Sequence, residues 1–142
     1  MTRPFLSLTR LPYDDSAWRV ELCASNGQFM GTQEFYTHEE ELINFGEQLE
    51  RFPKDINDEV VFKQGEPSKD WFYFLLVRAF IFDSLGHAAV EIATSNNADS
   101  PCSTQVRFSI LTEVAAINAF GQSIKEWITD TQASLKWTPT LL

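Results

Sequence analysis

Alternating apolar and polar residues predict a β-hairpin near the amino terminus. Between residues 18 and 25 every second side chain is apolar, starting with Trp18. This period of two places one face of a strand in a core and the other face in water. The run ends at Asn26-Gly27, two residues that tolerate the positive φ angles of a type I′ turn. We therefore expect residues 28–36 to form the partner strand.

A period of three to four residues follows the hairpin and predicts a helix over residues 38–52. Pro53 ends this helix, because proline disfavours helical backbone in the residue before it. Thr37 stands three residues before Glu40, which is the spacing of a capping box at a helix start. The apolar stripe that would face the sheet consists of Leu42, Phe45, Leu49 and Phe52.

The middle of the chain reads as a series of strands. Val60 to Lys63 forms a short one, and the run from Trp71 to Val77 is apolar at both parities, as in a central strand covered on both faces. A helix is the competing interpretation of that run, but its aromatic content favours a strand. Residues 87–94 and 105–111 again alternate, which predicts an antiparallel meander.

A second amphipathic helix is expected to start near Thr112 or Glu113, and its periodicity weakens beyond Thr131. The tail over residues 131–142 either docks through Leu135 and Trp137 or frays. We find no internal repeat in the sequence. The order of elements predicts a single α+β domain over residues 1–142, with a mostly antiparallel sheet of about six strands and two helices packed on one face.

The charge of the chain is negative and unevenly distributed. Its 142 residues contain 20 acidic and 11 basic side chains, giving a formal net charge of -9. The window from Glu34 to Glu59 holds nine of the acidic residues against only Arg51 and Lys54. Such a field attracts basic partners and repels nucleic acid, because no basic stripe is available to contact phosphates. We therefore expect no binding of nucleic acid.

Residues with catalytic or metal-binding potential are few and scattered. The two histidines, His38 and His87, form no His-Glu-x-x-His motif and no close His/Asp pair, and Cys23 and Cys102 are too few for a disulfide scaffold. Phosphate-loop and nucleophile-elbow motifs are absent. We expect no catalytic residue, no metal and no cofactor, and hence no enzyme. Without a secretory signal or an apolar run of bilayer length, we expect a cytoplasmic chain that does not enter the membrane.

The outer face of the first predicted helix is the candidate binding site. On a helical wheel, the face opposite the apolar stripe carries Glu40, Ile43, Glu47 and Glu50, so that one apolar side chain lies among three carboxylates. A charged rim speeds association and an apolar centre supplies affinity, which fits a basic protein partner. The alternative interpretation is an ordinary solvated face that keeps the protein in solution.

Over residues 18 to 128 the chain resembles the small bacterial immunity proteins of the WapI-type group. The residues that carry this resemblance are Phe45, Leu49, Phe52 and Pro53, the run Gly86-His87-Ala88-Ala89-Val90-Glu91-Ile92, the run Val106-Arg107-Phe108-Ser109-Ile110, and Ala116, Ile117, Ala119 and Phe120. The resemblance implies a protein that binds and neutralises a cognate toxin, often a nuclease, without catalysis. The alternatives are a small-ligand-binding domain, with the aromatic strand as a pocket wall, and a structural or oligomeric domain of unknown role.

Overall fold

The computed structural model describes residues 3–13, 16–130 and 132–139. Within these ranges the chain forms eight strands and two helices. Their bounds, in chain order, are β1 (Phe5–Leu11), β2 (Trp18–Ser25), β3 (Met30–Thr37), α1 (Glu39–Arg51), β4 (Glu59–Gly65), β5 (Phe74–Ile81), β6 (Ala88–Ser95), β7 (Gln105–Thr112), α2 (Val114–Thr129) and β8 (Ser134–Trp137).

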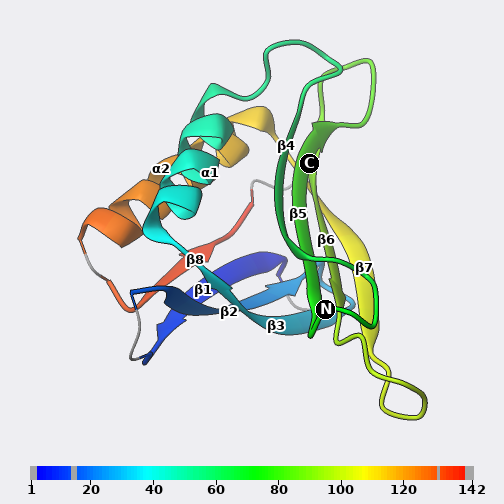
Figure 1. Cartoon of the computed structure of the whole chain (residues 1–142). Coiled ribbons are helices and arrows are strands. Elements are labelled where there is room, and N and C mark those ends of the chain that lie inside the picture. The colour runs from blue at the N-terminus through cyan, green and yellow to red at the C-terminus, as the bar shows by residue number, and fades with distance from the viewer. Residues whose placement is uncertain (1–2, 14–15, 131, 140–142) are drawn as a thin grey trace.

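The strands form two antiparallel sheets, and the helices pack in the angle between them (Figure 1). The first sheet has the order β3-β2-β1-β8 and the second has the order β4-β5-β6-β7. The α+β class, the antiparallel pairing and the two helices are confirmed. The expectation of one sheet of about six strands is wrong, because β1 and β8 were not recognised and the strand that follows each helix joins the other sheet.

The two halves of the chain have the same order of elements. The sequence analysis found no internal repeat and therefore missed this. In each half of the chain a three-stranded meander leads into a helix, and the strand after the helix crosses over. The strand β4 thus joins the second sheet beside β5, whereas β8 returns to the first sheet beside β1. The two halves therefore exchange their fourth strands and share one core.

Matching residues confirm this internal repeat. Four buried residues of α1 and its C-cap Phe52 have counterparts on α2, always 75 positions further along the chain: Leu42 and Ile117, Phe45 and Phe120, Gly46 and Gly121, Leu49 and Ile124, Phe52 and Trp127. The turns after β2 and β6 also correspond. Asn26 Oδ1 accepts hydrogen bonds from Gln28 N and Phe29 N, and Asn96 Oδ1 accepts them from Ala98 N and Thr104 N.

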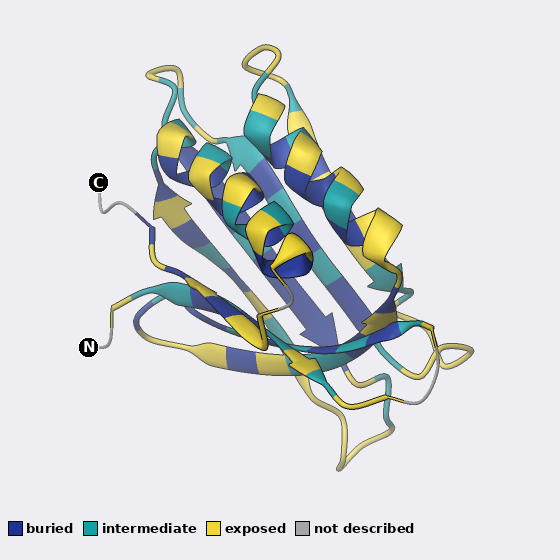
Figure 2. Cartoon of the chain, turned by 90° about the vertical axis from the view of Figure 1, so that its left-hand side faces the viewer, coloured by how far each residue is buried: buried dark blue, intermediate teal, exposed yellow. Residues whose placement is uncertain are grey.

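The helices lie side by side, with their exposed positions turned away from the sheets (Figure 2). They approach most closely at Gly46 and Gly121, where no side chain separates the two backbones. Asn118 of α2 also donates from Nδ2 to the carbonyl oxygens of Leu49 and Phe52, each at 2.8 Å. These bonds satisfy carbonyls at the C-terminal end of α1 and fix the position of one helix against the other.

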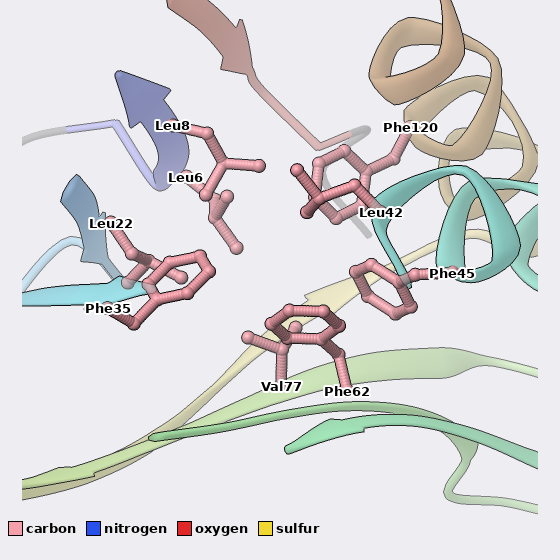
Figure 3. A pocket seen from close by; sticks show the side chains of 9 residues that line it. All are labelled: Leu6, Leu8, Leu22, Phe35, Leu42, Phe45, Phe62, Val77 and Phe120. Atoms are coloured by element: carbon pink, nitrogen blue, oxygen red, sulfur yellow. The ribbon is translucent and has the colours of Figure 1, made fainter. Parts of the chain in front are cut away.

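The core lies where both sheets meet both helices. Figure 3 shows side chains from the four components pointing toward one centre: Leu6, Leu8, Leu22, Phe35, Leu42, Phe45, Phe62, Val77 and Phe120. The space left between them is about 10 Å³, which is at most the room of one water molecule. This void is a packing defect of an apolar core and has no capacity for a small-molecule ligand.

Equivalent aromatic pairs connect each helix to the strand that follows it. The rings of Phe45 and Phe62 have centroids 5.1 Å apart, and those of Phe120 and Trp137 are 4.9 Å apart. Trp137 also donates from Nε1 to the carbonyl oxygen of Ala116 at 3.0 Å. Within the predicted tail, residues 134–137 therefore dock as β8, with Leu135 and Trp137 buried. Residues 131 and 140–142 lie outside the described residues.

Two local predictions at the start of the chain need correction. The β2–β3 hairpin is present, but its loop spans residues 26–29 and is closed by the Asn26 side chain and by Asn26 N donating to Phe29 O. The capping box is absent, because Thr37 is the last residue of β3 and is buried opposite Trp18. His38 occupies the N-cap position and makes no side-chain capping bond.

The predicted strand from Trp71 to Val77 begins later, at Phe74. Trp71 and Phe72 belong to the loop before β5 and are 52% and 96% exposed. The apolar run therefore does not reflect burial on both faces of a strand. Its first residues are surface aromatics, and only the part from Phe74 onward enters the second sheet.

Candidate functional site

The first turn of α1 presents a row of carboxylates to solvent. Glu39, Glu40 and Glu41 are exposed, and so is Glu47, which lies nearly two turns further along the helix. We call these four residues the acidic α1 surface. Carboxylates in a first turn interact favourably with the helix dipole, which gives them a structural explanation.

Comparison with α2 weakens that structural explanation. At the positions equivalent to Glu39, Glu40 and Glu41, the first turn of α2 carries Val114, Ala115 and Ala116. The position equivalent to Glu47 is Gln122. Both helices occupy the same place in the repeat, so this place in the fold does not require an acidic first turn.

The four residues that sequence reasoning selected on α1 occupy different environments. Glu40 and Glu47 are exposed, as expected. Glu50 faces α2, where its Oε1 lies 2.7 Å from Lys125 Nζ and raises the pKa of that amine through their hydrogen bond. Ile43 is partly buried and packs against the core. Ile43 is thus not an exposed apolar anchor in a ring of carboxylates.

Aromatic residues next to the acidic α1 surface supply contact area that sequence reasoning did not place there. The rings of Tyr13 and Tyr36 have centroids 5.1 Å apart, and Tyr36 N donates to Tyr73 Oη at 3.0 Å. Burial raises the pKa of Tyr73, and the charge of Glu41 acts in the same direction. We call Tyr13, Tyr36 and Tyr73 the tyrosine cluster.

The loop that carries Tyr73 is held in place from the second sheet. Asn97, in a left-handed conformation with φ of 53°, donates from Nδ2 to the carbonyl oxygens of Glu66 and Trp71 at 2.8 and 3.0 Å. Lys69 adds an ion pair to Asp99 at 2.8 Å. The exposed Trp71 and its neighbours therefore lie on a loop with defined anchoring contacts.

A close histidine–aspartate pair is present, contrary to the sequence analysis. His87 Nδ1 lies 2.6 Å from Asp83 Oδ2, and Asp83 Oδ1 accepts hydrogen bonds from Leu85 N and His87 N. The hydrogen bond with Asp83 raises the pKa of His87, and the bonds from His87 lower the pKa of Asp83 despite partial desolvation. These contacts close the turn between β5 and β6, which is a sufficient structural role.

Other candidate chemistry is limited within the described ranges. No group of three or more His, Cys, Asp or Glu side chains there could hold a metal ion. Cys23 is partly buried and Cys102 is exposed, and both are free thiols, as expected from their number. Neither described helix is long and apolar enough to cross a membrane.

Comparisons with known proteins identify a similar fold and no family. No protein-family model matches the chain, and no curated protein matches it. A solved structure of the plant transcriptional regulator PBF-2 is similar, with a TM-score of 0.51 and 7% sequence identity over 92% of this chain and 80% of that chain. At this identity the likeness is one of fold alone.

Proposed function

We propose that this chain is a non-enzymatic protein-binding domain that engages a basic protein partner through the acidic α1 surface. The observation that carries this proposal is the difference between the equivalent helices. The buried positions of α1 and α2 have matching residues, whereas the four glutamates of the acidic α1 surface correspond to uncharged residues on α2: Val114, Ala115, Ala116 and Gln122. An acidic α1 that the fold does not require is consistent with a function at its surface.

The tyrosine cluster takes the role that sequence reasoning gave to Ile43. Tyr13 and Tyr36 are 48% and 42% exposed and contact each other, and Tyr36 precedes the first residue of α1 by three positions. Tyrosine is enriched among the residues that dominate binding energy, because a rigid ring buries a large area and its hydroxyl can hydrogen-bond. The carboxylates would then steer the partner, and the tyrosines would hold it.

The resemblance to WapI-type immunity proteins suggests the nature of the partner. A toxin with a basic active site, such as a nuclease, is attracted by an acidic surface in the same way as by its polyanionic substrate. A net charge of -9 also opposes direct binding of this chain to nucleic acid. The partner would be encoded next to this chain, because an immunity gene lies beside its toxin gene.

Moving the charges from α1 to α2 tests this proposal. The variant Glu40→Ala/Glu47→Gln receives the residues that α2 carries at the equivalent exposed positions. A second variant adds Ala115→Glu/Gln122→Glu to it, which restores the net charge on the other helix. Association with the product of the neighbouring gene is measured by surface plasmon resonance at low and high salt.

We expect both variants to associate about tenfold more slowly than the wild type at low salt, and the difference to shrink at high salt. Their melting temperatures should stay near that of the wild type, since all four positions are exposed. If the charge-moved variant associates as fast as the wild type, net charge and not the α1 surface directs binding. If the wild type does not bind the neighbouring product, the immunity hypothesis is wrong.

A further inference from the structure

The outer edge of β4 has no strand of the described residues beside it. This seven-residue strand pairs with β5 on one side, and its backbone makes no other backbone hydrogen bond within the described part of the chain. The edge of β3 differs, because Tyr36 N donates to Tyr73 Oη and the Gln33 side chain donates to Glu34 O at 2.8 Å. Unpaired donors and acceptors on a strand edge are a template for another strand.

A groove runs along this edge, between β4 and α1. It consists of two adjoining cavities of about 170 and 520 Å³ that share Asn44 and Gln48 of α1. The smaller cavity is lined by Glu41 and Lys63, and the larger one lies at the opposite end of the strand, beside Glu59. The groove therefore follows β4 along most of its length and is open to a partner.

The sequence of β4 is complementary to itself. Glu59, Val61 and Lys63 alternate along the outer face of the strand, and Val61 is 41% exposed. If a second β4 pairs antiparallel to the first with Val61 at the twofold axis, each Glu59 lies opposite the Lys63 of the other copy. The two Val61 side chains then meet at the centre. Opposite charges and β-branched residues in facing positions are the pairs that stabilise antiparallel strands.

The charges on α1 and the following loop obey the same symmetry. Arg51 and Lys54, at the Glu59 end of the groove, make no ion pair among the described residues, whereas Lys63 pairs with Glu66. Glu41 lies at the Lys63 end, where it accepts a hydrogen bond from Gln64 at 2.7 Å. Antiparallel pairing brings the Glu41 end of one copy to the Arg51 and Lys54 end of the other. The unpaired cations would thereby face a carboxylate.

We propose that β4 pairs with β4 of a second copy of this chain, forming a twofold-symmetric dimer in which the two second sheets join into one continuous sheet. An isologous interface requires a surface that is complementary to itself, which Glu59, Val61 and Lys63 provide. The contact is small, so we expect micromolar rather than nanomolar affinity. Glu40 and Glu47 do not line the groove, and the dimer does not depend on the proposed toxin-binding function.

Charge reversal at the two facing positions tests this pairing. In Lys63→Glu the facing residues are all acidic, and in Glu59→Lys they are all basic, so each variant repels itself. A mixture of the two variants restores two opposite-charge pairs. In each pair the Lys63→Glu copy supplies the acidic residue and the Glu59→Lys copy supplies the basic one. The matched control is Lys69→Glu, which makes the same charge change on an exposed loop residue. Mass is measured by light scattering over a concentration series.

The wild type and Lys69→Glu should shift from the 16.2 kDa monomer toward twice that mass as concentration rises. Each reversed variant alone should remain monomeric, and the equimolar mixture should recover the dimer. Hydrogen exchange of the β4 amides should slow on dimerisation. A wild type that stays monomeric at its highest attainable concentration, or dimers that persist in both separate variants, would overturn the proposal. The first result would leave the groove to an extended peptide, and the second would place the interface elsewhere.

Discussion

Replacing Gly121 by alanine is expected to destabilise the protein, although alanine is the better helix former. A methyl group on Gly121 would lie 2.4 Å from Gly46 O, 2.8 Å from Glu50 N and 2.9 Å from Leu49 Cβ. Two of these atoms belong to the backbone of α1 and cannot move by rotation of a side chain. The helices must separate, which costs about 3 kcal/mol, at the upper end for an overpacked site. Alanine returns about 1 kcal/mol of helix propensity, so the net loss is about 2 kcal/mol.

Gly46→Ala is the graded comparison. Its methyl group would lie 2.9 Å from Gly121 O and 3.1 Å from Lys125 Cγ, and the lysine side chain can move aside. We therefore expect a net loss of no more than about 1 kcal/mol. Urea unfolding measures both variants, with Gln122→Ala on the exposed face of α2 as the control for an alanine substitution away from the helix crossing. A Gly121→Ala variant as stable as Gln122→Ala would refute the close helix crossing.

Two further predictions concern buried hydroxyls and the turn before β6. The hydroxyls of Thr37 and Thr112 are buried and have no hydrogen-bond partner among the described residues. Replacing Thr112 by valine removes such a hydroxyl, so Thr112→Val should raise the free energy of unfolding by about 1 kcal/mol. Urea titration measures this change, and a loss of stability would contradict the prediction. For the turn, Asp83→Asn should lower the pKa of His87 toward its ordinary value in an NMR titration, and an unchanged pKa would reject the pairing. The Asp83 pKa is lowered and the His87 pKa is raised, so the pair stabilises the fold most between the ordinary pKa values of aspartate and histidine. This contribution is lost as pH falls through the Asp83 pKa or rises through the His87 pKa.

The sequence was informative about local structure wherever burial is periodic. The helix predicted over residues 38–52 is α1, and the strand starting at Trp18 is β2 with its apolar face in the core. Periodicity depends on which side of an element is covered, so it could not report that β4 and β8 exchange between sheets. That exchange is a long-range property, visible only once the pairing of Leu6 with Trp137 and of Val60 with Ala79 is known.

The candidate site was predictable only in part for a related reason. A helical wheel places Glu40 and Glu47 on the outer face correctly, but it has no information on neighbouring elements. The second helix covers the side of α1 that carries Ile43 and Glu50, and Lys125 comes from a distant part of the chain. Likewise Tyr36 and Tyr73 are far apart in sequence, and no local pattern predicts that one binds the other.

The internal repeat acts as a control for separating structural from functional features. A feature that both halves share, such as the glycines at the helix crossing, is explained by the common architecture. The acidic α1 surface is found in the first half alone, and so is the self-complementary β4. Its counterpart β8 has four residues, with Ser134 and Lys136 at the positions equivalent to Glu59 and Val61, and so lacks the pattern that pairs Glu59 with Lys63. Both proposed interfaces therefore lie on α1 or β4. These elements differ from their counterparts α2 and β8 at exposed positions, whereas the buried positions of the repeat are apolar in both halves.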